Sequence, residues 1–133
     1  MLATLTCDTS VCTVHEAVGF VIVGGWLLLM LWGGVAYVSK REPNQWFWRT
    51  LGALQGILLL QVVLGITLLA MGRERAILHY LYGAVFPGIV LAVAHVLARG
   101  LEDEADRWKV FAVASFFVFG LTLRALMTGL GLA

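Results

Sequence analysis

The chain has 133 residues, of which 61% are hydrophobic and only 13% are charged. A soluble domain of this size could not bury so many apolar side chains in one core, so the composition indicates a membrane protein. The formal net charge of +1 excludes the broad basic field that is typical of nucleic-acid binding. No basic stretch precedes the first apolar run and no small-residue cleavage site stands out, so we expect no removable signal peptide.

Four apolar runs are long enough to cross a bilayer, and they cover residues 14–38, 46–71, 76–98 and 108–131. A helix of about 22 residues spans the hydrocarbon layer of ~30 Å. Backbone groups in lipid need internal hydrogen bonds, so each run should be a helix. Because the connections are short, neighbouring helices should be antiparallel. We therefore predict an all-α integral membrane protein with one domain over residues 1–133, an antiparallel four-helix transmembrane bundle.

The basic residues predict the orientation of the bundle. Six of them lie in or beside the first and third connections: Lys40, Arg41, Arg49, Arg99, Arg107 and Lys109. The second connection holds only Arg73 and Arg75. The positive-inside rule puts the six in the cytoplasm, which places both termini outside the cell membrane. Trp46, Trp48 and Trp108 lie at the predicted cytoplasmic ends, as interfacial anchors do.

Two histidines open the first and third runs, in the stretches "CTVHEAVG" and "ILHYLYG". His15 and His79 should both lie near the outer boundary, and each has a glycine four residues on, Gly19 or Gly83. Two neutral imidazoles at one depth can bind a heme iron from both faces, and a glycine one turn along leaves room for the porphyrin. We interpret the pair as a heme site. The alternatives are two separate interfacial histidines, each bonded to a carbonyl or water, or a zinc site, for which no third ligand is evident.

Two other polar residues lie within the apolar runs. His95 comes 16 residues after His79, which is about 24 Å and ~160° away on a straight helix. No other histidine lies near the cytoplasmic side, so we interpret His95 as structural or as facing a neighbouring subunit. Arg124 is inside the last run, where it could pair with heme propionates or extend to the headgroups. Arg73 and Arg75 are second candidates for the propionates.

Cys7 and Cys12 precede the first histidine on the predicted outer side, where oxidising conditions favour a disulfide. The loop that it closes is short, so its contribution to stability should be modest. Glu16 follows His15 directly. We interpret Glu16 as capping the start of the helix, where the dipole favours a carboxylate; the alternative is an acid or base at the heme edge.

Taken in order, these motifs resemble the heme A synthase family. The likeness comprises the cysteine pair, "VHEAVG", the stretch "LQGILLLQVVLGITLL" with a glutamine-x-x-leucine-glycine pattern from Gln61 to Gly65, and "LHYLYGAVF" on a helix that ends in Arg99. It covers about residues 7 to 99. Familiar members have two such four-helix repeats, so this chain is similar to a half-length member. Where the family commonly has a glutamate, three residues before the first histidine, this chain has Cys12.

The resemblance implies that His15 and His79 bind heme b, heme O or heme A, and that Cys7 and Cys12 take part in turnover. It implies oxidation of the ring methyl of heme O to the formyl group of heme A, with oxygen taken from water. Heme O synthase is then a candidate partner. Because a single repeat has one heme site and many small residues in its helices, we expect a homo-oligomer in the lipid. The alternatives are a small b-type cytochrome for electron transfer and a non-catalytic heme-handling subunit of a respiratory complex.

Overall fold

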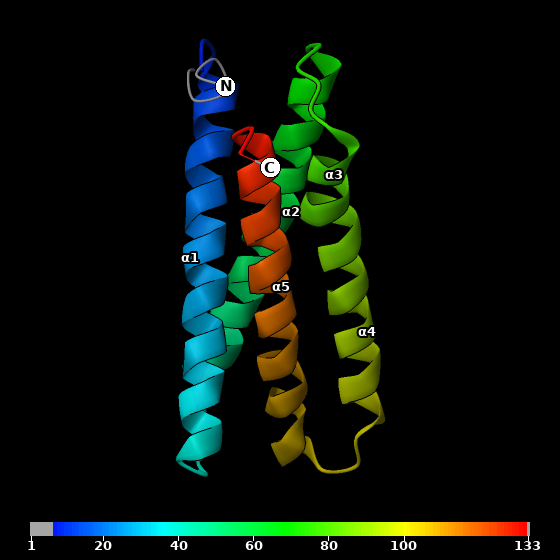
Figure 1. Ribbon diagram of the computed structural model, residues 1–133. Helices are drawn as coiled ribbons and strands as arrows, with labels where there is room; N and C mark the ends of the chain where they lie inside the picture. The colour runs from blue at the N-terminus through cyan, green and yellow to red at the C-terminus, as the bar shows by residue number, and fades with distance from the viewer. Residues whose placement is uncertain (1–6, 133) are drawn as a thin grey trace.

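The computed structural model describes residues 7–132, and it is helical almost throughout (Figure 1). In chain order the elements are α1 (Ser10–Val38), α2 (Gln45–Ala70), α3 (Ile77–Tyr80), the π-helical turn η2 (Leu81–Val85), α4 (Phe86–Gly100), the short 3₁₀ helix η3 (Glu104–Asp106) and α5 (Arg107–Gly129). The segments α3, η2 and α4 form one continuous span. Within residues 7–132, four helices are thus long and apolar enough to cross a membrane, which confirms the predicted four-helix transmembrane bundle.

The helix ends follow from local capping. The side chain of Thr9 accepts a hydrogen bond from the Cys12 N–H at 3.2 Å, so α1 begins at Ser10, four residues before the apolar run. The side chain of Asn44 caps α2 in the same way, at 3.0 Å from the Trp46 nitrogen. The prediction that Glu16 caps the first helix is wrong, because this early start places Glu16 in the second turn.

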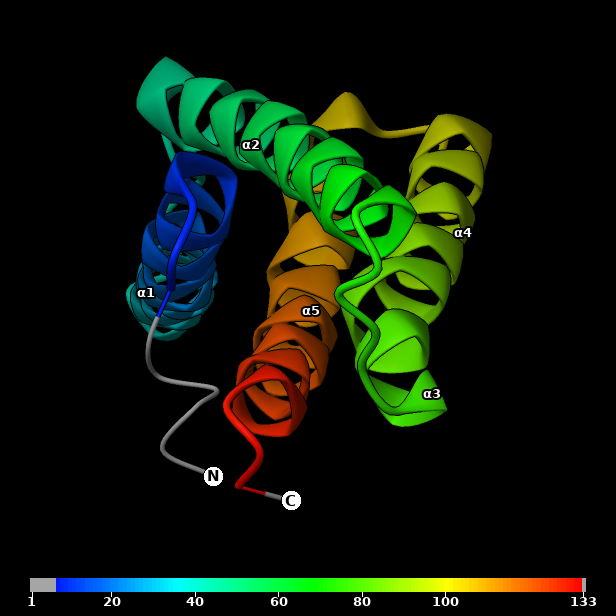
Figure 2. The same cartoon turned by 90° about the horizontal axis from the view of Figure 1, so that it is seen from above.

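The helices are arranged with α5 in the middle, packed between α1 and α4, while α2 packs across α1 (Figure 2). The start of α1, the end of α5 and the connection between α2 and α3 lie at one end of the bundle (Figure 1). The other two connections lie at the opposite end. His15 and His79, near the starts of their spans, are therefore at the same end, and His95 is toward the other.

The core is concentrated where α1, α2 and α5 meet. Trp26, Leu29, Phe47 and Val118 are each 0% exposed. At Gly33 a Cβ atom would lie 2.6 Å from the Cβ of Ala112, so this glycine allows α1 and α5 to approach closely. Many other apolar side chains face outward, as expected of a protein whose surroundings are lipid.

A wide turn interrupts the third span just after His79. Pro87 has no N–H, and in a regular helix its ring would collide with the carbonyl of Gly83. The π-helical turn η2 relieves this conflict, and the N–H of Phe86 bonds to the carbonyl of Leu81, five residues back. The turn therefore sets the direction in which the short helix α3 presents His79 to the bundle.

Candidate functional site

The structure brings His15 of α1 and His79 of α3 together. Their ring centroids are 6.2 Å apart and their planes are inclined at 77°. Both rings line a cavity of about 180 Å³ that is bordered by α1, α2, α3, η2 and α5. His15 and His79 are far apart in the sequence and lie on different helices, so the packing of the helices brings the two rings together.

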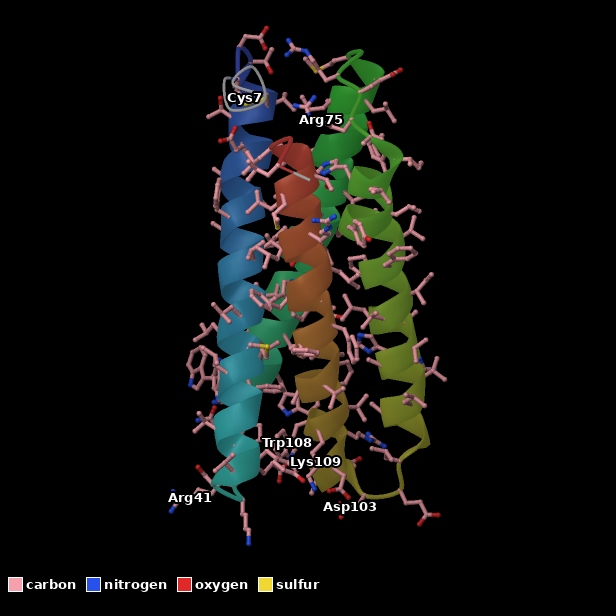
Figure 3. All side chains as sticks on the ribbon, in the orientation of Figure 1. Cys7, Arg41, Arg75, Asp103, Trp108 and Lys109 are labelled. Carbon is pink, nitrogen blue, oxygen red and sulfur yellow. A yellow bond between two sulfur atoms is a disulfide. The ribbon has the colours of Figure 1, made fainter. Side chains whose placement is uncertain are left out.

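The cavity has an apolar inner part and a polar mouth. Its inner wall is mostly aliphatic, with side chains such as Ile22, Leu58 and Leu126. The mouth, at the end of the bundle that Figure 3 marks with Cys7 and Arg75, includes Cys12 and Arg75. A flat ligand with an apolar body and polar substituents would match this gradient.

A backbone carbonyl holds the ring of His79. Its Nδ1 lies 2.9 Å from the carbonyl oxygen of Ala125, and because a carbonyl can only accept, Nδ1 carries the proton. Nε2 is then the nitrogen with the free lone pair. A Cβ at Gly129 would lie 2.8 Å from Cε1 of His79, so any larger residue at this position would collide with the ring.

The ring of His15 packs against α2. A Cβ at Gly65 would be 3.3 Å from Cε1 of His15, so the ring lies close to the backbone of α2. The side chain of Gln61 donates from Nε2 to the His15 carbonyl at 2.7 Å and ties α2 to α1. Nδ1 of His15 and Oε1 of Gln61 are buried without hydrogen-bond partners among residues 7–132. Such atoms are costly unless a ligand or water satisfies them.

The two glycines of the HxxxG spacing line the cavity without touching the rings. A Cβ at Gly19 would meet Nε2 of Gln61 at 3.3 Å, and one at Gly83 would meet the Cβ of Ala125 at 3.5 Å. They therefore serve helix packing around the cavity. The glycines that make room for the rings are Gly65 and Gly129; the sequence motifs included the first, and no local signal connects the second with His79.

The predicted disulfide joins Cys7 and Cys12 beside the mouth. Within its ring, Asp8 pairs with Arg73, with an Asp8 Oδ1 to Arg73 Nη2 distance of 2.6 Å. The hydrogen bond from Arg73 holds the pKa of the Asp8 carboxyl below its usual value. A carboxylate oxygen of Glu16 lies 3.4 Å from Sγ of Cys7, a contact in which the oxidised sulfur has no proton to donate.

The remaining candidates lie elsewhere. Arg124 does not line the cavity, and its guanidinium carbon is 6.0 Å from the ring centroid of Tyr82. Arg73 and Arg75 do line it, and Nε of Arg75 donates to the Gly129 carbonyl at 3.3 Å. His95 bonds through Nε2 to Oε1 of Gln55 at 2.7 Å and is far from the histidine pair along its helix.

Residues 7–132 contain no cluster of three or more side chains that could bind a metal ion. No three histidine, cysteine, aspartate or glutamate side chains lie close enough there to hold an ion. A metal at His15 and His79 would therefore have two protein ligands, and its other ligands would come from the bound group itself, as in a heme.

The fold and the cavity define a multi-pass α-helical membrane protein with a half-buried histidine pair at one end. Comparison with known proteins adds no relative, because no family model, no curated protein and no solved structure matches the chain. The proposal for its function therefore rests on the site itself and on the motif order.

Proposed function

We propose that this chain is a membrane protein that binds heme between His15 and His79, and that it oxidises the ring methyl of heme O to the formyl group of heme A. The observation that carries the heme proposal is the separation of 6.2 Å between the two imidazole centroids. The reaction rests on the resemblance in motif order, since heme-binding geometry is shared by enzymes and electron carriers.

The separation agrees with simple bond arithmetic. A metal–imidazole bond is about 2.0 Å long, and the centre of an imidazole ring is about 1.2 Å from each nitrogen. Two rings on opposite sides of one metal therefore have centres roughly 6–6.5 Å apart. The free Nε2 of His79 is in the tautomer that such coordination needs, because Nδ1 donates to Ala125.

The competing interpretation needs no metal. Neutral aromatic rings also pack edge to face with centroids about 4.5–7 Å apart. That packing gives no reason for a cavity lined by both rings, with an apolar inner wall and a polar mouth. We therefore favour the heme interpretation and design the test to separate the two.

The size of the cavity constrains how a heme would be bound. Pockets for small molecules are commonly about 300–1,000 Å³, and this cavity is about 180 Å³. We expect part of the macrocycle to extend between the helices toward lipid. Arg75, at the mouth, is better placed than Arg124 to pair with propionates.

When bound, the heme would be the substrate, and oxidation of its methyl group with oxygen from water would release electrons and protons that must pass to an external electron acceptor. The chain holds it through two imidazoles and keeps water from its apolar part with side chains such as Leu58 and Leu126. Glu16 lines the mouth and is the acid nearest to His15 in sequence, so it is our candidate for accepting a proton there. We propose that the mouth faces the outside of the cell membrane, as the basic residues indicate.

The first test is the absorption spectrum of the purified protein. We expect a low-spin bis-histidine spectrum, which is lost in the His15→Ala and His79→Ala variants. His95→Ala is the matched control, because His95 is a histidine of the same bundle outside the cavity. A colourless wild-type protein, or loss of the spectrum only in His95→Ala, would contradict the proposed ligands.

The second test concerns the reaction. The protein is co-expressed with a heme O synthase, and the extracted hemes are analysed by mass. A formylated heme that depends on His15 and His79 is the expected result. If the spectrum is present and heme O is recovered unchanged, the protein is a b-type cytochrome or a heme-handling subunit.

A further inference from the structure

A second cavity lies at the opposite end of the bundle, next to the first and third connections. Its volume is about 420 Å³, and side chains from α2, α4, α5 and the two connections line it. The wall carries both signs of charge, from Glu42, Arg99, Glu104 and Arg107. This cavity shares no residue with the histidine site, so its role is a separate question.

The charges in this cavity are only partly paired within the described chain. Arg107 is 3.7 Å from Glu104 and donates from Nη2 to the Leu101 carbonyl at 3.4 Å, while its Nε is buried without a hydrogen-bond partner among residues 7–132. Glu42 and Arg99 are exposed and form no ion pair in the same part of the chain. Groups of opposite charge that face one cavity without pairing leave donors and acceptors for a ligand that carries both charges.

The deeper wall is aromatic. Phe111 packs edge to face with His95 at 4.9 Å and with Trp48 at 5.5 Å between ring centroids. His95 is hydrogen-bonded to Gln55 and lines the cavity. The cavity is also at the end of the bundle that Figure 3 marks with Trp108, where Trp46 and Trp48 are exposed, and exposed tryptophans mark the level of lipid headgroups.

We propose that this cavity binds the headgroup of a zwitterionic phospholipid whose amine carries protons, a phosphatidylethanolamine. The phosphate would accept hydrogen bonds from Arg107 and Arg99, and the ammonium would donate to Glu42. An anionic lipid would leave Glu42 unpaired beside a negative headgroup. A choline headgroup has the same charges and no N–H, so it cannot donate to the carboxylate.

The test is lipid retention by the full chain in nanodiscs that contain equal parts of phosphatidylethanolamine, phosphatidylglycerol and phosphatidylcholine. Native mass spectrometry should show one phosphatidylethanolamine molecule retained about tenfold more than either other lipid, the effect of one charge-assisted hydrogen bond. Equal retention of the three lipids, or a preference for phosphatidylglycerol in the wild type, would overturn the proposal.

Variants test the assignment of each charge. Glu42→Gln and Arg107→Gln should each abolish the preference, while Lys40→Gln, an exposed charge in the same connection and outside the cavity, should keep it. Glu42→Lys should convert the preference to phosphatidylglycerol, a gain that a misfolded chain cannot give. Displacement of the lipid by an equal concentration of soluble phosphoethanolamine would assign the cavity to a soluble ligand and would also overturn the proposal.

Discussion

The position of each histidine ring depends on a glycine in another helix. At Gly65 the backbone of α2 lies against His15, and at Gly129 the backbone of α5 lies against His79. These contacts, together with the hydrogen bond between His79 and Ala125, constrain the orientation of the two rings. The position of each histidine ring thus depends on single residues of the helix that packs against it.

Gly129→Ala should displace the ring of His79, because the new Cβ would lie 2.8 Å from Cε1. We expect a loss of about 1–3 kcal/mol in the free energy of unfolding, the usual cost of overpacking, together with loss of the bis-histidine spectrum. Thermal unfolding in detergent measures the first and absorption the second.

Gly120→Ala is the matched control in the same helix, because a Cβ there meets nothing within 4 Å. It should change stability by less than about 1 kcal/mol and leave the spectrum intact. Equal effects of the two substitutions would show that contact with His79 is not the cause.

At the scale of the element, the π-helical turn directs α3. Pro87→Ala supplies an N–H and removes the ring clash, so the third span can become a regular helix. Removing the extra residue of the turn rotates the preceding segment by roughly 100° about the axis, which carries His79 away from His15. We expect unchanged helix content by circular dichroism and loss of the heme spectrum.

Pro43→Ala is the control for this change, since Pro43 lies in the first connection and outside every helix. It should preserve both helix content and spectrum. A Pro87→Ala protein that still binds heme normally would show that the turn does not position His79.

The disulfide ring is the second element-scale feature. Cys7 and Cys12 are separated by 5 positions, so the loop-entropy model gives a contribution of about 2 kcal/mol or less. Reduction, or the Cys7→Ser/Cys12→Ser double variant, should lower the unfolding temperature slightly and keep all four spans. Thermal unfolding with and without reductant measures this, and loss of the bundle on reduction would contradict it.

The Asp8–Arg73 pair should respond to acid in a defined direction. The folded-state pKa of Asp8 is lowered, so the contribution of the pair is fully present above the unfolded value of about 3.9. It is lost as the pH falls through the folded-state pKa. Because both side chains are exposed, at 37% and 66%, the pair affects the mouth of the cavity more than the stability of the protein.

At the scale of the whole molecule, orientation in the membrane is the main prediction. Two exposed acidic residues provide matched labelling sites at opposite ends, Glu74 and Glu102. A membrane-impermeant maleimide should label Glu74→Cys in intact cells and Glu102→Cys only after permeabilisation. The reverse pattern would place the histidine site in the cytoplasmic half.

Hydropathy predicted the four spans within a few residues, because lipid forces every apolar run of sufficient length to satisfy its backbone as a helix. The larger difference is at α1, which begins at Ser10 because Thr9 provides a cap before the apolar run. The disulfide was predicted from the oxidising conditions expected on the outer side, and it is present. The histidines and their common end of the bundle were also evident from the motifs.

The sequence by itself determined that four helices cross the membrane and that His15 and His79 lie near the same end, since length, hydropathy and connection count fix depth. It could not determine which way each ring faces, because rotation about a helix axis is set by packing against other helices. Gly129 lies 50 positions from His79, and Arg124 was placed beside Tyr82 instead of the cavity only by the position of α5. The tertiary structure decided these contacts, since they join helices that local sequence does not relate.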